Sequence, residues 1–93
     1  MVDWIWDESK NAENRRKHGL GFDTAVLVFE DEHLASRPDT FPGEDRWNTV
    51  GTVAHMIIFV VHTEAQTDGG TGRIISARKA TAHERKAYEK GEF

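Results

Sequence analysis

Residues Met56-Ile57-Ile58-Phe59-Val60-Val61 form the longest apolar run in the chain. Its branched and aromatic side chains are typical of a β-strand. The run is also far shorter than the roughly 20 residues that a membrane-spanning helix needs. Because apolar residues follow one another without polar alternation, both faces of this strand should be buried. We therefore expect residues 56–61 to form a central strand of a sheet.

Further strands are expected on either side of this run. Residues 73–80 alternate, so Ile75 and Ala77 are expected on one face of a strand and Ile74 on the other. Shorter or less regular patterns predict the remaining strands and their connections, namely strands at 3–6, 33–37 and 45–52, a turn at Ala54-His55, and a glycine-rich hairpin loop at 66–72.

Two helices are expected before residue 30. Asp7 is a suitable N-cap for a helix over residues 8–18. Gly19 follows this helix at the position where a left-handed backbone conformation commonly ends a helix. This helix is weakly amphipathic and should carry more polar chemistry than core. A second apolar stripe predicts another helix, which begins at Gly21, a poor cap, and ends at the acidic residues 30–32.

A last helix is expected near the end of the chain. Thr81 and Glu84 match a capping box, and the helix should extend over residues 82–90. Helices at both ends of a run of strands, without alternation of strand and helix, indicate an α+β fold. We expect a small, mostly antiparallel β-sheet packed with two N-terminal helices and one C-terminal helix.

Composition excludes several classes of protein. The chain has 93 residues, which predicts a single domain over residues 1–93. It has no cysteine, so disulfides, thiolate metal sites and cysteine nucleophiles are excluded. The first residues do not match a signal peptide, and no apolar run is long enough to span a membrane. These features predict a cytoplasmic protein that has no membrane anchor.

The balance of charge is acidic, with a net charge of −4. Taken alone, this argues against a nucleic-acid-binding protein. The charges are clustered, however, with basic residues gathered at 15–18 and 73–86 and acidic residues at 30–32 and 44–45. This pattern fits either a molecule with one basic face or ordinary solvated surface charge.

No common catalytic motif is present. The five histidines, which are His18, His33, His55, His62 and His83, have no metal-ligand spacing, so neither a metal nor another cofactor is expected. No serine lies in a GxSxG motif. The glycines of residues 69–72 lack the lysine of a phosphate-binding loop, so a flexible hairpin loop is the better interpretation.

Cations and proton carriers remain, and metal-free RNA cleavage requires such groups. In that reaction the 2′-hydroxyl attacks its neighbouring phosphate, helped by a base, an acid and cations around the phosphate. The available side chains are Lys17, His18, Arg46, Glu64, Arg73, Arg78, Lys79 and Tyr88. From composition alone, each of them could equally have a structural role.

The order of these residues resembles the BrnT toxin family. The resemblance covers nearly the whole chain through Trp6-Asp7, Lys10, Asn14, Lys17-His18-Gly19, Phe22, Ala25, Phe29, Glu44, Arg46-Trp47, Gly51, Thr63-Glu64, residues 73–80, Glu84 and Tyr88. Its most specific parts are Lys17-His18-Gly19 and residues 73–80. The acidic balance is unusual for a nuclease of this class.

The resemblance implies a RelE-like fold and a function. It implies a toxin of a bacterial type II toxin–antitoxin system, an endoribonuclease that arrests translation and growth. Its implied partner is a BrnA-type ribbon-helix-helix antitoxin, through which the complex binds operator DNA. The implied active surface comprises Lys17 and His18 for proton transfer or charge stabilisation, Arg46, Arg73 and Arg78 for phosphate binding, Glu64 as a second candidate base, and Lys79 and Tyr88 as further RNA contacts.

Two alternatives remain open. A chain with the same fold could have lost catalysis and serve only as a co-repressor with its ribbon-helix-helix partner, which the acidic balance favours. A plain structural subunit would leave the cationic positions replaceable.

Overall fold

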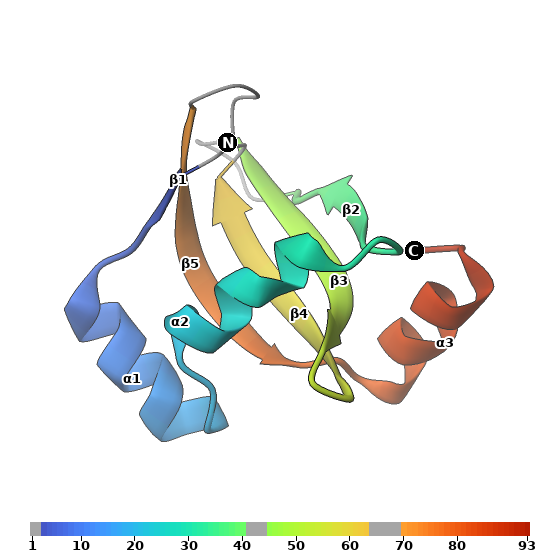
Figure 1. Ribbon diagram of the computed structural model, residues 1–93, viewed down its shortest axis with the longest axis horizontal. Helices are drawn as coiled ribbons and strands as arrows, with labels where there is room; N and C mark the ends of the chain where they lie inside the picture. Colours follow the sequence, from blue (N-terminus) through green and yellow to red (C-terminus); the bar gives the residue numbers. More distant parts are fainter. Residues whose placement is uncertain (1–2, 41–44, 64–69) are drawn as a thin grey trace.

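The computed structural model describes residues 3–40, 45–63 and 70–93, and every strand in these ranges joins one five-stranded sheet (Figure 1). The strands are β1 (Asp3–Ile5), β2 (Ala35–Pro38), β3 (Arg46–Val53), β4 (Met56–Thr63) and β5 (Thr71–Lys79). Their order is β1-β5-β4-β3-β2, with β1 parallel to β5 and the other pairs antiparallel. The predicted α+β fold with a mostly antiparallel sheet is confirmed, and β4 is central.

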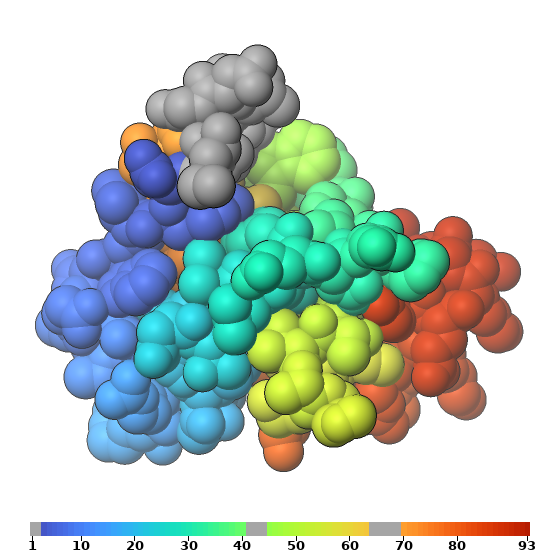
Figure 2. Space-filling model, viewed as in Figure 1, coloured from blue at the N-terminus to red at the C-terminus, as the bar shows by residue number. Residues whose placement is uncertain are grey.

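Helical segments cover one side of the sheet. They are α1 (Glu8–His18), α2 (Phe22–Ala25), the 3-10 helix η1 (Val26–Glu30) and α3 (Ala82–Lys90). In Figure 1, α2 and η1 cross in front of the sheet, while α1 and α3 lie at opposite sides of the view. The atoms of α1, α2 and η1 cover much of the side shown in Figure 2. We call this side the helix-covered face.

The hydrophobic core lies between the helix-covered face and the helices. Its buried members are Leu20, Phe22, Ala25, Val28, Val53, Ile58, Val60, Ile74 and Ala77. Full burial of a side chain such as Phe22 or Ile58 stabilises the fold by about 1.5–3 kcal/mol. A Cβ on Gly51 of β3 would lie 2.7 Å from Val28 Cγ2. This glycine therefore lets η1 pack directly on the backbone of the sheet.

Polar contacts fix α1 to the rest of the molecule. Asn11 and Asn14 are its buried residues. Asn11 Oδ1 accepts a hydrogen bond from Phe22 N (2.8 Å) and so replaces the side-chain cap that Gly21 cannot provide. The prediction that this helix carries more polar chemistry than core is confirmed, and part of that chemistry faces inward.

The second helix differs from its prediction. Instead of one helix that ends at the acidic residues 30–32, a four-residue α2 passes into the 3-10 helix η1 at Val26. Over two turns, apolar residues three or four positions apart suit both helix types, so spacing alone cannot separate them. The strand predicted at 33–37 is observed as β2, an edge strand that ends at Pro38.

The predicted alternation along β5 is wrong at Ile75. Val61 pairs with Ser76 and His62 pairs with Ile74, so Ile75 is an extra residue in a β-bulge. The bulge shifts the alternation, and Ile74 and Ala77 are both buried in the core. The strand also begins at Thr71, inside the predicted hairpin loop, of which residues 66–69 lie outside the described residues.

Candidate functional site

The face of the sheet opposite the core carries arginines. Val50 pairs with Phe59, and Phe59 pairs with Arg78, so these residues share one face. The Arg78 guanidinium lies over the Phe59 ring, 4.2 Å from its centroid. Arg37 of β2 lies over the Phe93 ring at the same distance, and the centroids of the two rings are 6.2 Å apart. Arg37 and Arg78 therefore lie on the same side of the sheet.

Arg46 and Arg73 lie further along this face. Arg46 is four residues before Val50 on β3, so alternation places it on the same side. It pairs with Thr63, whose Oγ1 accepts a hydrogen bond from Arg73 N (2.9 Å). Arg73 precedes the buried Ile74 and so lies on the side away from the core. We call the side that carries Arg37, Arg46, Phe59, Arg73, Arg78 and Phe93 the arginine face.

Several hydrogen bonds hold Arg78 in place. Its Nη1 and Nη2 donate to Glu84 Oε1 (2.7 Å) and Oε2 (3.0 Å), and Nη1 also donates to Lys79 O (3.2 Å). The hydrogen bonds to Glu84 raise the pKa of Arg78, and the same bonds lower the pKa of the Glu84 carboxyl. Both groups are charged, and the guanidinium plane is fixed against the sheet. Nε and the second N–H of Nη2 have no partner among the described residues.

Lys17 and His18 border the arginine face at its β5 edge. They line a groove of about 270 Å³ together with Lys10, Glu13, Asn14, Ile75 and Ser76. Ser76 pairs with Val61, in the row beside that of Arg78, so the groove adjoins the arginine face. Lys17 Nζ lies 3.0 Å from Glu13 Oε1 in an exposed ion pair. The groove therefore brings His18 and the cations Lys10 and Lys17 together along α1.

The remaining predicted site residues lie elsewhere. Lys79 pairs with Ile58, so it lies on the opposite side of β5 from Arg78, where it is exposed. Tyr88 of α3 donates to Asp31 Oδ2, and its hydroxyl accepts a hydrogen bond from Thr52 Oγ1 (3.1 Å). Glu64 lies outside the described residues.

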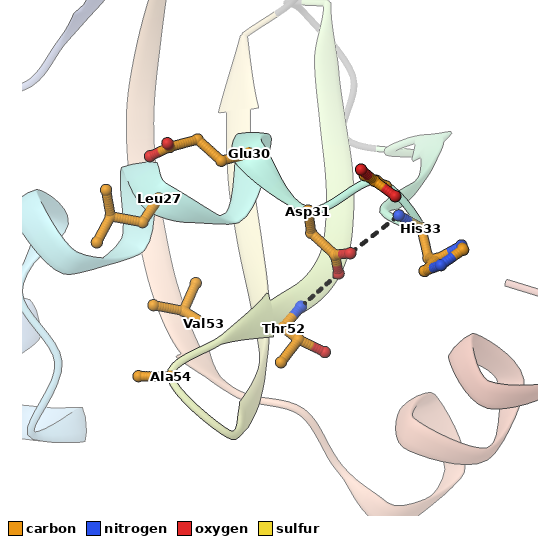
Figure 3. Close-up of a pocket in the computed structure, with 8 residues that line it drawn as sticks. Leu27, Glu30, Asp31, His33, Thr52, Val53 and Ala54 are labelled. Carbon is orange, nitrogen blue, oxygen red and sulfur yellow. Dashed lines mark hydrogen bonds between the residues drawn. The ribbon is translucent and has the colours of Figure 1, made fainter.

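Asp31 joins three elements beside an acidic hollow. Its carboxylate accepts hydrogen bonds from Thr52 N (2.7 Å) and His33 N (2.9 Å), as Figure 3 shows. Burial raises its pKa, but the hydrogen bonds from Tyr88, Thr52 and His33 outweigh that effect and lower it. Burial and Asp31 together raise the pKa of Tyr88.

The hollow beside Asp31 has a volume of about 550 Å³ and is lined by Leu27, Glu30, Asp31, Glu32, His33, Thr52, Val53 and Ala54. Three carboxylates there disfavour a phosphate.

His62 is a structural histidine. It is buried against the stacked rings of Trp4 and Phe29, which it meets edge-to-face with centroid distances of 5.2 and 5.0 Å. Its Nδ1 must carry the proton, because its partner 2.7 Å away is the Thr63 carbonyl oxygen, which can only accept. Nε2 therefore accepts from Thr49 Oγ1 (2.6 Å). Burial lowers the pKa of His62, which keeps the ring neutral.

The described residues offer no group of three or more histidine, aspartate or glutamate side chains that could hold a metal ion. Within the same residues, no helix is long and apolar enough to cross a membrane.

The sequence analysis did not predict Arg37 and Phe93 as part of the arginine face. Only the pairing of β2 with β3 and the ring contacts bring them there, and neither leaves a signal in local sequence.

Fold and site together define a small α+β protein with a cationic sheet face, a class suited to binding polyanions. A family model described as "Ribonuclease toxin, BrnT, of type II toxin-antitoxin system" matches residues 6–84, and the chain belongs to this family. The family implies an RNA substrate and an antitoxin partner.

A solved structure agrees with this assignment. The crystal structure of the Brucella abortus ribonuclease toxin BrnT is similar, with a TM-score of 0.64 and 29% sequence identity. The match covers 87% of this chain and 99% of that one. No curated protein matches the sequence.

Proposed function

We propose that this chain is a metal-independent endoribonuclease that cuts RNA on the arginine face and thereby arrests translation and growth. One observation carries the proposal. Arg46, Arg73 and Arg78, which come from two strands, share one face of the sheet, and the groove of Lys17 and His18 adjoins it. These are the residues that the family resemblance implies for the active surface.

The arrangement suits attack of a 2′-hydroxyl on its own phosphate. Arg46 and Arg73 bind the phosphates of the RNA, and the fixed plane of Arg78 presents its remaining N–H groups to the phosphate that becomes crowded during attack. Lys17 and His18 transfer protons or stabilise charge from the groove at the β5 edge. Glu64, which follows Thr63 in the sequence, is a second candidate base.

Lys79 and Tyr88 have weaker support in this scheme. Lys79 can reach RNA only around the edge of β5, since it lies on the opposite side from Arg78. The Tyr88 hydroxyl is engaged with Asp31, so its contribution to RNA binding would come from the ring.

The distribution of charge supports RNA binding despite the net charge of −4. The acidic residues Glu30, Asp31 and Glu32 gather at the hollow beside η1, whereas the arginines lie on the opposite face of the sheet. Phosphate contacts depend on local charge within about one Debye length, roughly 8–10 Å, rather than on the sum over the chain.

Cleavage of two matched oligonucleotides tests this proposal. One is all RNA, and the other has a single 2′-deoxy residue at the cleaved position; both are incubated with excess chelator. We expect the RNA to be cut into a 2′,3′-cyclic phosphate and a 5′-hydroxyl, and the deoxy substrate to stay intact. Cleavage at the deoxy position, or loss of all activity on chelation, would overturn the mechanism.

We also propose a ribbon-helix-helix protein of BrnA type as the antitoxin, with operator DNA bound only through it. Co-expression with such a protein from the same operon should relieve growth arrest and give a stable complex. In a gel-shift assay the complex should bind operator DNA, and the toxin alone should not. Relief of arrest without complex formation would contradict direct neutralisation.

A non-catalytic co-repressor is the second candidate, and one observation favours it. Arg78 is paired with Glu84 and Lys17 with Glu13, which reduces the charge available to a phosphate. A folded chain that binds its antitoxin and the operator, but does not cut RNA, would support this alternative.

A further inference from the structure

We propose that Arg37 and Phe93 form a platform on which a nucleobase of bound RNA stacks. The inference rests on the proposed function, because it concerns RNA on the same arginine face. It adds recognition of a base to a surface whose cations are proposed to bind phosphates. The candidate ligand is an unpaired base of single-stranded RNA.

Four side chains form a continuous stack across the arginine face. Arg37 of β2 lies 4.2 Å from the centroid of Phe93, Phe93 packs edge-to-face on Phe59 of β4, and Arg78 of β5 lies 4.2 Å from the centroid of Phe59. Cations thus stand at both ends of a pair of rings. Such contacts hold a guanidinium flat, in the orientation that stacks on a base.

The two ends of this stack differ in how accessible their side chains are to a ligand. Arg78 is tied to both oxygens of Glu84, and Phe59 is only 7% exposed. Arg37 is exposed and Phe93 is half-buried. With one side of the Arg37 guanidinium on Phe93, the other side is open to solvent. Bases of single-stranded RNA stack on arginine planes and aromatic rings in this way.

The platform lies within one nucleotide of a proposed phosphate contact. Arg37 pairs with Asn48, which is two residues from Arg46 on β3. That separation is roughly 7 Å along the strand, and the neighbouring strand adds about 5 Å across the sheet. A strand of RNA whose phosphate contacts Arg46 can therefore place its adjoining base over Arg37.

Binding of an uncleavable probe separates stacking from charge. The probe is a short 2′-O-methyl oligonucleotide, in versions with all bases present and with one abasic position at each site in turn. The variants are Arg37→Lys, which keeps the charge but not the plane, Phe93→Leu, which removes the ring, and Arg37→Ala. Arg15→Ala serves as the control, because Arg15 pairs with Asp23 of α2, away from the arginine face.

For the intact probe we expect Arg37→Lys and Phe93→Leu each to weaken binding on the order of 5- to 100-fold. For the probe that lacks the stacked base, the two variants should bind like the wild type. Arg37→Ala should also reduce the slope of log affinity against log salt by about one phosphate contact, while Arg37→Lys should leave the slope unchanged. The control should bind both probes like the wild type.

Two results would overturn the platform. One is equal binding of the intact probe by the wild type, Arg37→Lys and Phe93→Leu, each shown to be folded by its thermal transition. The other is a wild type for which no single abasic position weakens binding. If the wild type cuts RNA and either result holds, the platform is wrong and the proposed function stands. If the wild type binds the probe as expected but cuts no RNA, the catalytic proposal is wrong and the platform stands.

Discussion

The side-chain amide of Asn14 in α1 binds the backbone of Ala77 in β5 through both of its polar atoms. Nδ2 donates to Ala77 O (2.8 Å) and Oδ1 accepts from Ala77 N (3.2 Å). Because β1 pairs with β5 only up to Arg73, β5 has an open edge at Ala77. Asn14 makes the hydrogen bonds there that the backbone of a neighbouring strand would otherwise make. The contact holds α1 at the open edge of β5, where Lys17 and His18 border the arginine face.

Replacing Asn14 by alanine should therefore destabilise the protein strongly. The change leaves Ala77 N, Ala77 O and Leu20 O without their partner in a buried setting. Each unpaired buried group costs about 1–3 kcal/mol, partly relieved where water enters, so we expect a loss of about 2–4 kcal/mol in the free energy of unfolding. Urea denaturation measures this. Arg16→Ala, an exposed change on the same helix, is the control, and equal transitions for the two variants would refute the role of Asn14.

The turn between β3 and β4 should be improvable. Ala54 and His55 have φ angles of 46° and 73°, the left-handed region that favours asparagine and glycine. The double change Ala54→Asn with His55→Gly should raise the free energy of unfolding by about 1–2 kcal/mol, because the strain of two left-handed residues is relieved. Thermal and urea denaturation check this. A double variant less stable than the wild type would mean that the turn is not strained as described.

Stability should fall in mild acid because of His62. Burial lowers the pKa of this histidine in the folded protein, so the unfolded chain binds a proton that the folded one excludes. The contribution of His62 to the free energy of unfolding is complete above the pKa of a histidine in the unfolded chain, about 6.5. It is lost as the pH falls from there toward the lower pKa of His62 in the folded protein. The slope from this one group cannot exceed about 1.4 kcal/mol per pH unit. Urea denaturation between pH 7 and pH 5 measures it.

The matched control for this pH effect is His62→Gln, which keeps hydrogen-bonding atoms but cannot titrate. The variant should be less stable than the wild type at pH 7, and its stability should depend less on pH in the same interval. The carboxyls of Asp31 and Glu84, whose pKa values are lowered in the folded protein, add losses only at lower pH, as they protonate. An identical pH dependence in both proteins would contradict this account of His62.

Tyr88→Phe separates a structural role of Tyr88 from a role in RNA binding. The phenylalanine keeps the ring but loses the hydrogen bond to Asp31, so α3 loses a link to η1. We expect the free energy of unfolding to fall by about 1–3 kcal/mol, the range for hydrogen bonds to charged groups and for a partner left unpaired. RNA cleavage by the folded variant, measured at low temperature, should be unchanged. A large loss of cleavage with unchanged stability would make the hydroxyl catalytic.

Local rules predicted much of the fold. Asp7 accepts from Ser9 N and Lys10 N, Gly19 adopts the left-handed C-cap, and Thr81 with Glu84 forms the predicted capping box. The central position of β4 also followed from its apolar run, because only a strand covered on both faces can be apolar throughout. In each case the deciding contact is within a few residues or is simple burial.

Features that depend on distant pairing could not be predicted in this way. The bulge at Ile75 appears only when β5 is aligned with β4, and it changes which residues of β5 face the core. Asn14 is a polar helix residue, which composition assigns to the surface, and its burial depends on the open edge of β5. Within the site, the family resemblance alone grouped Arg46, Arg73 and Arg78. Strict alternation along β5 would place Arg73 and Arg78 on opposite faces, and the bulge brings them to the same face. Arg37 joins them only through the β2–β3 register.

RNA cleavage by two double variants of equal charge shows whether RNA is cut on the arginine face. Arg46→Ala with Arg73→Ala removes two cations from the arginine face, and Arg15→Ala with Arg85→Ala removes two from helices outside it. Both proteins should give folded thermal transitions. We expect the first variant to lose at least about 100-fold in cleavage rate and the second to stay within about twofold of the wild type. Equal losses in the two variants, or full activity in the first, would show that RNA is not cut on this face.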